Sequence, residues 1–232
     1  MSLTGIEVGD GRTRTRHGLL RAQQLPSRHG WIRIGLVATE ALLLGGDTVE
    51  LEVTLDHGAR LELFEVAGTV AYHSRGRPSG WQARISLAAG SRLRCRGEPF
   101  VVADGADVDR SLDLDLEPSA SAVLREIVVF GRSGEEGGRL RNRTCLRVGG
   151  EPVLLEDQCL DGPTRNLPGI LGDHRVVDTV IMLGDCPVPQ APPPGSASFS
   201  LVGGHGGLIR HLGRQAAGSP IPDLYASLTR EA

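Results

Sequence analysis

The sequence predicts a mostly β fold, namely a twisted two-layer arrangement of largely antiparallel sheets with many hairpins and one or two short helices near the C-terminus. Apolar and polar residues alternate with a period of two over many short segments, as they do in half-buried strands. The 32 Gly and 14 Pro among 232 residues suit tight turns better than long helices. Aromatic residues make up only 3% of the chain, so Leu, Val, Ile and Ala must build the core.

Hairpins are predicted where two alternating segments flank a short turn. In residues 48–55 apolar side chains point one way and polar ones the other, the turn 56–59 follows, and residues 60–66 return as a second strand. The same unit recurs at residues 83–87 and 92–96. Further strands are predicted at residues 109–116, 122–130, 139–148, 152–155, 174–183, 199–202 and 207–214.

The last part of the chain is predicted to contain a loop and a helix. Residues 184–196 ("GDCPVPQAPPPGS") cluster prolines, so we expect an extended loop there, within one β domain that spans residues 1–232. Residues 222–230 predict a terminal helix, because Pro222 suits a first helical turn.

Composition argues against several classes of function. The net charge of −3 is close to neutral, so no strong steering toward nucleic acid or an anionic membrane is implied. All 25 basic residues are Arg, which excludes the lysine of a phosphate-binding loop or a Schiff base. The N-terminus has no apolar run like that of a signal peptide, and no stretch approaches the ~18 apolar residues of a membrane span. A cytoplasmic protein is therefore expected.

Cysteine and histidine spacing predicts neither a disulfide framework nor a metal site. No two of the four cysteines form a C-x-x-C pair, so free and mostly buried thiols are expected. None of the histidines pair at a metal-ligand spacing such as H-x-x-x-H, which favours surface or structural roles. The cysteines are Cys95, Cys145, Cys159 and Cys186, and the histidines are His17, His29, His57, His73, His174, His205 and His211.

The segment "GGHGGL" (residues 203–208) resembles a phosphate loop or an esterase oxyanion segment only superficially. A phosphate loop needs a Lys after its last Gly, and an esterase needs G-x-S-x-G elsewhere in the chain. Neither is present, so a plain loop is favoured. A hydrolase or metalloenzyme that uses His205, His211 and a carboxylate is kept as an alternative from another functional class.

A row of arginines lines one face of the predicted strand 139–148, at Arg139, Arg141, Arg143 and Arg147. Pairing with acidic residues of a neighbouring strand, such as Asp113 and Asp115, is a sufficient structural explanation. A protein-binding face is the second interpretation. A nucleic-acid face is the third, because no aromatic residues are interleaved for base stacking.

Four acidic residues fall at turns or strand ends, where a scaffold can present them to a partner or to a passing ion. They are Glu98, Asp104, Glu135 and Glu136. The alternative is that they are solvated or cap a turn. For Asp104 this alternative predicts an Asx-type turn, because Gly105 follows it.

Four segments in order resemble the urease accessory protein UreD (also called UreH) family. They are "LLLGGD" (residues 42–47), "GTVAYHSRG" (68–76), "GEPFVVADGADV" (97–108) and "VVFGRSGEEGG" (128–138). The positions that resemble the family's motifs are Gly45, Gly46, Asp47, Thr69, Tyr72, Glu98, Asp104, Gly105, Ala106, Gly131, Arg132 and Glu135. "LIRHLG" (208–213) is similar to the family's late arginine-containing strand.

The resemblance implies a scaffold and nickel-insertion chaperone rather than an enzyme. Members of this family bind apo-urease and the partner UreF, which recruits the GTPase UreG, and a dimer within the accessory complex is compatible with this. The resemblance implies no cofactor of its own, only nickel in transit, with Glu98 and Asp104 as candidate weak ligands. It also implies partner-binding candidates, at Tyr72, Arg132, Glu135 and Glu136, and structural turns, at Gly45, Gly46, Asp47, Gly105 and Gly131. A generic β-sandwich interaction module remains a further alternative.

Overall fold

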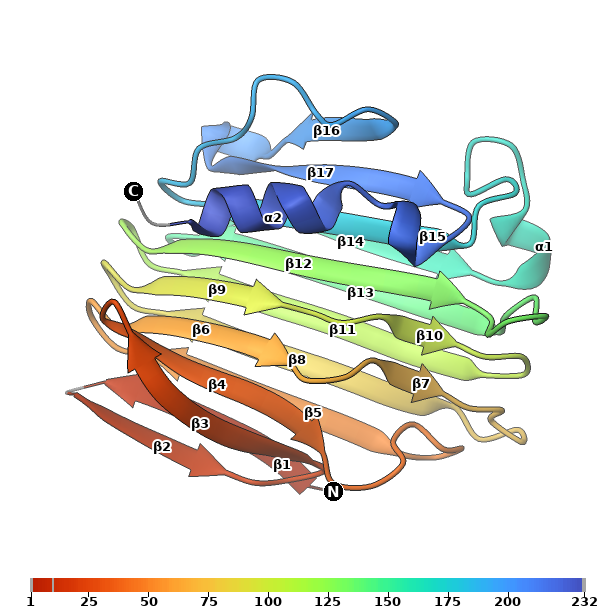
Figure 1. Cartoon of the computed structure of the whole chain (residues 1–232), viewed down its shortest axis with the longest axis horizontal. Coiled ribbons are helices and arrows are strands. Elements are labelled where there is room, and N and C mark those ends of the chain that lie inside the picture. The colour runs from red at the N-terminus through yellow and green to blue at the C-terminus, as the bar shows by residue number, and fades with distance from the viewer. Residues whose placement is uncertain (1, 10, 231–232) are drawn as a thin grey trace.

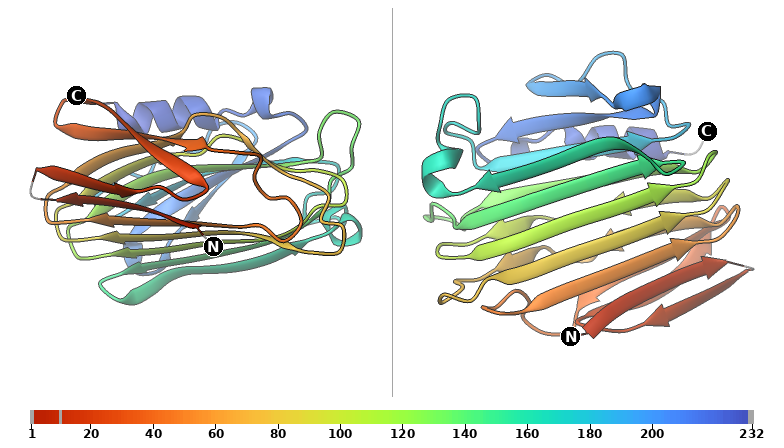
Figure 2. Two further views of the ribbon diagram at one scale, coloured as in Figure 1. Left: turned by 90° about the horizontal axis from the view of Figure 1, so that it is seen from below. Right: turned by 180° about the vertical axis from the view of Figure 1, so that it is seen from behind.

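Two β-sheets lie face to face, and the chain passes repeatedly from one to the other (Figures 1 and 2). The computed structural model describes residues 2–9 and 11–230. Sheet A has seven strands, in the order β14 (Glu151–Leu160), β13 (Arg139–Val148), β11 (Asp107–Leu116), β8 (Ser79–Leu87), β5 (Thr48–Leu55), β1 (Ser2–Gly9) and β2 (Arg12–Arg16).

Sheet B has ten strands and faces sheet A. Its main path runs β16 (Ser196–Ser200), β17 (Gly206–Gly213), β15 (Val176–Leu183), β12 (Ser121–Phe130), β9 (Arg92–Arg96), β6 (Arg60–Glu65), β4 (Trp31–Ala38) and β3 (Leu20–Arg28). The short strands β7 (Thr69–Ala71) and β10 (Phe100–Val102) pair with each other, and β10 also pairs with β12. Figure 1 views the outer face of this sheet, on which helix α2 (Ile221–Thr229) lies.

The mostly β, two-layer prediction is confirmed, but the largely antiparallel pairing is wrong. Among the described residues, nine of the fifteen strand pairs are parallel. The predicted hairpins at 48–66 and 83–96 do not form, because in each case the first strand belongs to sheet A and the second to sheet B. The chain crosses between the sheets at those turns, so β5 pairs in parallel with β8 and β6 pairs in parallel with β9.

Several predicted boundaries agree with the structure within a few residues. β12 and β13 match residues 122–130 and 139–148, and α2 matches the predicted terminal helix. β14 continues five residues beyond the predicted 152–155, and Ser196 of the predicted loop already belongs to β16. The other helical turns are α1 (Gly162–Arg165), η1 (Val202–Gly204) and η2 (Ala216–Gly218). Within the described residues no helix is long and apolar enough to cross a bilayer.

The main core fills the space between the sheets, where the inward-facing residues of alternating strands meet. Val53 of β5, Leu63 of β6 and Leu114 of β11 are fully buried there. A smaller apolar cluster lies on the outer face of sheet B, where Ile221 and Tyr225 of α2 pack against β12, β15 and β17. The period-two alternation therefore has one cause, burial of the facing sides of two sheets.

The cysteines are free, but the prediction that most are buried is wrong. Cys95, Cys145 and Cys186 are half-buried, and Cys159 is exposed. Cys159 alternates with Gln158 and Leu160 on the edge strand β14, so it points away from the space between the sheets.

Candidate functional site

A row of polar side chains crosses the space between the sheets. In sheet B, Glu126 of β12 lies opposite Thr179 of β15, which in turn lies opposite Arg210 of β17. In sheet A, Arg110 of β11 lies opposite Asn142 of β13. Strand alternation directs these residues inward, between layers of Leu and Val. A β-sandwich core is ordinarily apolar, so this row is the feature that most needs a functional explanation.

Two cavities lie along the polar row. The first has a volume of about 60 Å³ and includes Glu65, Glu98 and Glu126 in its lining. The second has a volume of about 30 Å³ and includes Glu126 and Glu156. Arg110 and Glu126 line both cavities, so this pair is the boundary between them. Each volume exceeds the ~10–15 Å³ that one water molecule requires.

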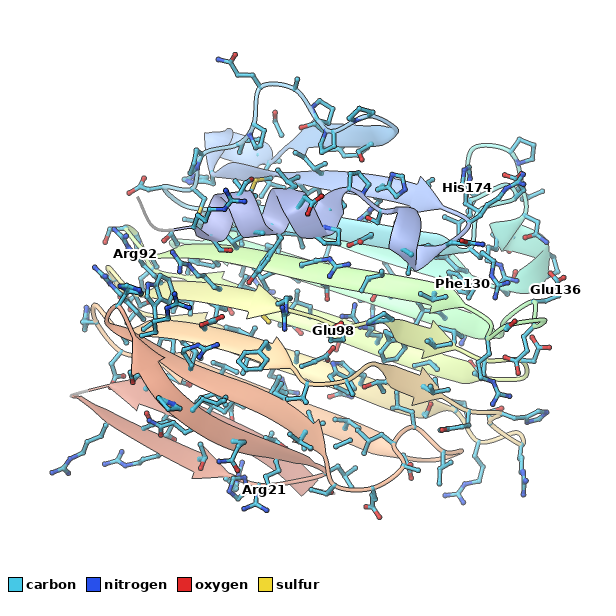
Figure 3. All side chains as sticks on the ribbon, viewed as in Figure 1. Arg21, Arg92, Glu98, Phe130, Glu136 and His174 are labelled. Atoms are coloured by element: carbon cyan, nitrogen blue, oxygen red, sulfur yellow. The ribbon has the colours of Figure 1, made fainter. Side chains whose placement is uncertain are left out.

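Glu98 lies where the first cavity reaches the surface. Sheet B is interrupted there, because β6 ends at Glu65 before β7 begins, and β9 ends before β10 begins. Figure 3 shows Glu98 in the middle of this face of the molecule. Its side chain is 30% exposed and forms an ion pair of 3.6 Å with Arg96. Its backbone N–H donates to Glu65 Oε2 at 2.8 Å, so Glu98 connects the surface to the first interior carboxylate.

Burial raises the pKa of Glu65 to about 7, and the Glu98 N–H and the Arg110 guanidinium reduce this effect. The neighbouring thiol of Cys95 is shifted in the same sense, since burial raises its pKa to about 12. Near neutral pH the Glu65 carboxyl therefore exchanges readily between its neutral and charged forms.

The far end of the polar row is closed by a second ion pair. Arg210 donates to both carboxylate oxygens of Glu156, at 2.8 and 2.9 Å, and to Thr179 Oγ1 at 3.1 Å. Gln158 also donates to Glu156, at 2.9 Å. The Glu156 side chain is 22% exposed on the edge strand β14. The row thus extends from the opening at Glu98 to the edge of the sandwich.

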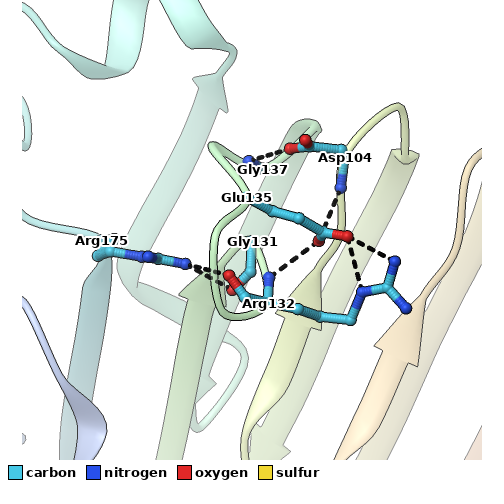
Figure 4. Close-up of polar contacts among 6 residues, drawn as sticks. All are labelled: Asp104, Gly131, Arg132, Glu135, Gly137 and Arg175. Carbon is cyan, nitrogen blue, oxygen red and sulfur yellow. Dashed lines mark hydrogen bonds and ion pairs between the residues drawn. The ribbon is translucent and has the colours of Figure 1, made fainter.

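Asp104 lies apart from this row, beyond the end of β10, and lines neither cavity. Its carboxylate accepts from the Gly137 N–H at 2.6 Å, and its own N–H donates to Glu135 at 3.2 Å (Figure 4). Asp104 does not form the predicted Asx-type turn with Gly105. Its carboxylate oxygen instead accepts from Gly137, which lies 33 residues further along the chain. The structure therefore does not bring Asp104 and Glu98 together.

Arg132 and Glu135 form a compact loop pair next to Asp104. Glu135 accepts from the Arg132 backbone N–H at 2.9 Å and from its Nε at 2.8 Å. The Glu135 side chain is only 17% exposed, whereas that of Arg132 is 56% exposed. Tyr72, at 37% exposure, and Glu136 are also exposed at this end of the molecule. Arg132, Tyr72 and Glu136 can thus meet a partner, while Glu135 holds the loop.

Two arginines that the sequence analysis did not single out support the same loop. Arg175 donates to the carbonyl oxygens of Phe130, Gly131 and Arg132 at 2.8–3.0 Å. Arg165 is buried, donates to the carbonyl oxygens of Glu136 and Gly138, and stacks 4.6 Å from the centre of the Phe130 ring. They lie 27 to 45 residues from their partners, so no local pattern could have indicated them.

The residues Gly45, Gly46 and Asp47 form a tight turn beside Tyr72. Asp47 Oδ2 accepts from the Leu44 N–H at 2.8 Å, and Gly46 has φ 95°, which favours glycine. A Cβ atom on Gly45 would lie 2.1 Å from the Ser74 carbonyl oxygen. Gly105 and Gly131 also have positive φ, at the turns that carry Asp104 and Arg132.

The histidines of the alternative hydrolase or metalloenzyme do not converge. His205 follows η1, whereas His211 lies on β17 with its Nδ1 3.0 Å from the Gly195 carbonyl oxygen. In the part of the chain that the structure describes, no group of three His, Cys, Asp or Glu residues is placed to hold a metal ion.

The arginine row of β13 is used for ion pairing. Arg147 contacts Asp115 at 3.3 Å, as predicted, and Arg141 makes a bidentate pair with Asp157 of β14. Arg139 pairs with Asp107 and Asp109, whereas Asp113 forms no ion pair among the described residues. Ion pairing thus accounts for three of the four arginines in the row, Arg139, Arg141 and Arg147.

The Glu135 contacts predict an acid-sensitive loop. Hydrogen bonds from Arg132 lower the pKa of Glu135 from 4.5 to about 2. Because the folded-state pKa is depressed, this contribution to stability is present above pH 4.5 and is lost as the pH falls toward 2. We expect the free energy of unfolding, measured in urea, to fall less steeply over this window in Glu135→Gln than in the wild type. If the free energy of unfolding falls equally steeply with pH in both proteins, the lowered pKa of Glu135 is contradicted.

Comparison with known proteins places the chain in one family. A family model described as UreD urease accessory protein matches residues 12–218. The chain is 47% identical to urease accessory protein UreD 1 of Streptomyces griseus subsp. griseus, over 80% of this chain and 71% of that protein. It is 34% identical to UreD of Streptomyces avermitilis, over 75% and 73% of the two chains. UreD of Streptomyces coelicolor is 31% identical, over 75% and 73%.

Proposed function

Since this chain belongs to the UreD family of urease accessory proteins, we propose that it is a maturation scaffold which binds apo-urease and partners of the UreF and UreG type and helps to deliver nickel to the urease active site. The matching relatives are named as accessory proteins rather than enzymes. The proposal places the protein in the cytoplasm and gives it nickel as cargo, with no cofactor of its own.

The observation that carries the nickel role is the polar row between the sheets. Glu98 at the surface leads to Glu65 and Glu126, and the row ends at Glu156 on the sandwich edge. Carboxylate oxygens bind divalent cations, but a tight site needs several of them to converge on one point. Here arginines separate the carboxylates, so an ion would meet few ligands at each step. Such an arrangement favours passage of an ion over its storage.

The partner surface proposed here is the end of the molecule that carries Tyr72, Arg132 and Glu136. Glu135, Arg165 and Arg175 hold these loops in place through the contacts described above. Surface loops held by a rigid scaffold are common sites of protein recognition. Figure 3 shows that Glu136 lies at one end of the molecule, well away from Glu98. Recognition and nickel passage are therefore assigned to separate parts of the fold.

The test is urease activation in cells together with a pull-down of the accessory complex. We expect Glu126→Gln to lower activation at least ten-fold while the complex still forms, because the amide preserves shape but removes the charge. Asp104→Asn is the matched control, since its amide oxygen can still accept from the Gly137 N–H. It should activate urease as the wild type does.

The outcomes separate the path from a structural role. Full activation by Glu126→Gln, Glu65→Gln and Glu98→Gln would exclude nickel passage between the sheets. Loss of the complex in Glu98→Gln would make Glu98 structural. If Asp104→Asn forms the complex but does not activate urease, the nickel path runs past Asp104 and the loop that carries Arg132 and Glu135 instead.

A further inference from the structure

Arg110 occupies the boundary between the two interior cavities. Its side chain is 13% exposed and extends inward from β11. One terminal nitrogen donates to Glu126, and the other donates to Asn142 Oδ1 at 3.0 Å. Its guanidinium carbon lies 5.6 Å from the centre of the Phe100 ring. Arg96 and Arg125 also line the first cavity, but they pair with Glu98 and Asp178, so Arg110 is the lining arginine that is bonded to Glu126.

Carboxylates and a thiol line the first cavity together with this guanidinium, although no three such groups of the described residues are placed to hold a metal ion. Glu65, Cys95 and Glu126 line the first cavity together with Arg110. Burial is the main cause of the raised pKa values of Glu65 and Cys95, and smaller charge interactions with Arg110 and Glu126 add to it with opposite signs. Oxygen and sulfur ligands of this kind bind first-row divalent metals. Without the Arg110 guanidinium, Glu126 would lose its ion-pair partner and Glu65 a favourable charge interaction, in a cavity with room for an ion.

The two interior ion pairs differ in how firmly they are held. Arg210 has its Nε and both terminal nitrogens hydrogen-bonded, and its partner Glu156 accepts further from Gln158. Arg110, by contrast, has a buried Nε with no hydrogen-bond partner among the described residues. A buried donor without a partner destabilises the arrangement that holds it. The Arg110–Glu126 pair is therefore the one that opens more readily.

We propose that Arg110 is a built-in counter-cation that keeps the first cavity from trapping a divalent metal ion. A passing ion competes with the guanidinium for Glu126, and Arg110 keeps Asn142 and Phe100 as partners while the ion is present. Arginine suits this role because it stays charged at all relevant pH values and its planar fork can bond two acceptors at once. This inference rests on the proposed function, since it concerns the same interior row.

The experiment measures binding of Ni²⁺ alone to the purified full-length protein by equilibrium dialysis. We expect Arg110→Gln to bind one Ni²⁺ at least ten-fold more tightly than the wild type, because Glu65 and Glu126 lose their counter-charge. The double variant Arg110→Gln/Glu126→Gln should return to the wild-type affinity. Arg141→Gln removes the same charge from an exposed pair and should leave the affinity unchanged.

Arg110→Lys keeps a charge at this position and provides a second test if Arg110→Gln does not fold. It should bind Ni²⁺ no more tightly than the wild type, and tighter binding by it would overturn the proposal. Equal affinity of folded Arg110→Gln and the wild type would also overturn it. A third outcome separates this inference from the proposed function. If Arg110→Gln binds Ni²⁺ tightly but Glu65→Gln and Glu126→Gln activate urease normally, Arg110 is a counter-cation and nickel is not delivered through this row.

Discussion

Replacing Asp178 by alanine is expected to lower the free energy of unfolding by about 3–5 kcal/mol, because the change leaves the Arg125 guanidinium buried without a carboxylate. Asp178 of β15 is fully buried and Arg125 of β12 is 9% exposed in its side chain. Two hydrogen bonds of 3.0 and 2.8 Å join them. The pair lies on the same face of the strands as the apolar cluster under α2. Water therefore cannot readily replace the lost partner.

Arg141 and Asp157 provide the matched control. This pair has the same bidentate geometry, at 3.0 and 2.8 Å, but its side chains are 41% and 44% exposed. Asp157→Ala should change the free energy of unfolding by no more than about 1 kcal/mol, because solvent screens exposed pairs. Urea denaturation of both variants gives the comparison. Equal losses in the two variants would show that burial does not set the strength of the Arg125–Asp178 pair.

The second large effect is expected at Glu65, and it depends on pH. Burial raises the pKa of Glu65 from 4.5 to about 7 in the folded protein. The neutral acid is therefore favoured by folding, so its contribution to stability is complete below pH 4.5 and is lost as the pH rises through 7. Glu65→Gln, which resembles the neutral acid, should be more stable than the wild type by about 2–3 kcal/mol at pH 8. At pH 4 the two proteins should have the same stability.

Urea denaturation of the wild type and Glu65→Gln at several pH values between 4 and 8 checks this expectation. The difference between the two proteins isolates Glu65 from all other titrating groups. A constant difference across the range would contradict a raised pKa for this carboxyl. If the difference appears and the variant also fails to activate urease, the chain retains a destabilising carboxylate for function, a trade-off common at functional sites.

The sequence resemblance and the structure contributed different parts of the functional assignment. The motifs around Gly45, Tyr72, Asp104 and Arg132 led to the family, and the structure shows that these residues gather at one end of the sheets. In the sequence Glu98 and Asp104 form one group, because both are acidic residues at turns or strand ends. The structure shows that their environments differ. Glu98 lines the first cavity, whereas the Asp104 carboxylate accepts a hydrogen bond from Gly137 of another loop.

Glu65, Arg110, Glu126 and Arg210 could not be recognised as a group from the sequence. Each lies in a strand that carries other polar residues, and alternation alone does not reveal which charged side chains face inward. Arg110 follows Asp107 and Asp109 on β11, where polar residues occupy both faces. Arg125 and Glu126 are the two charged residues of the otherwise apolar segment 122–130. Successive side chains of a strand point to opposite faces of the sheet. Arg125 therefore meets Asp178 on the outer face of sheet B, and Glu126 meets Arg110 between the sheets.

Short strands with one apolar face, a proline-rich loop and a terminal helix can be predicted from the sequence, because they depend on local periodicity and on the conformational limits of Gly and Pro. Which strands pair is visible only in the folded protein. Residues 48–55 and 60–66 bury the same apolar faces whether they form a hairpin or lie in opposite sheets, so local pattern cannot distinguish the two. Antiparallel pairing of β12 with β15 and of β15 with β17 places Glu126, Thr179 and Arg210 side by side, and parallel pairing of β11 with β13 places Arg110 beside Asn142. The interior polar row therefore depends on which strands pair.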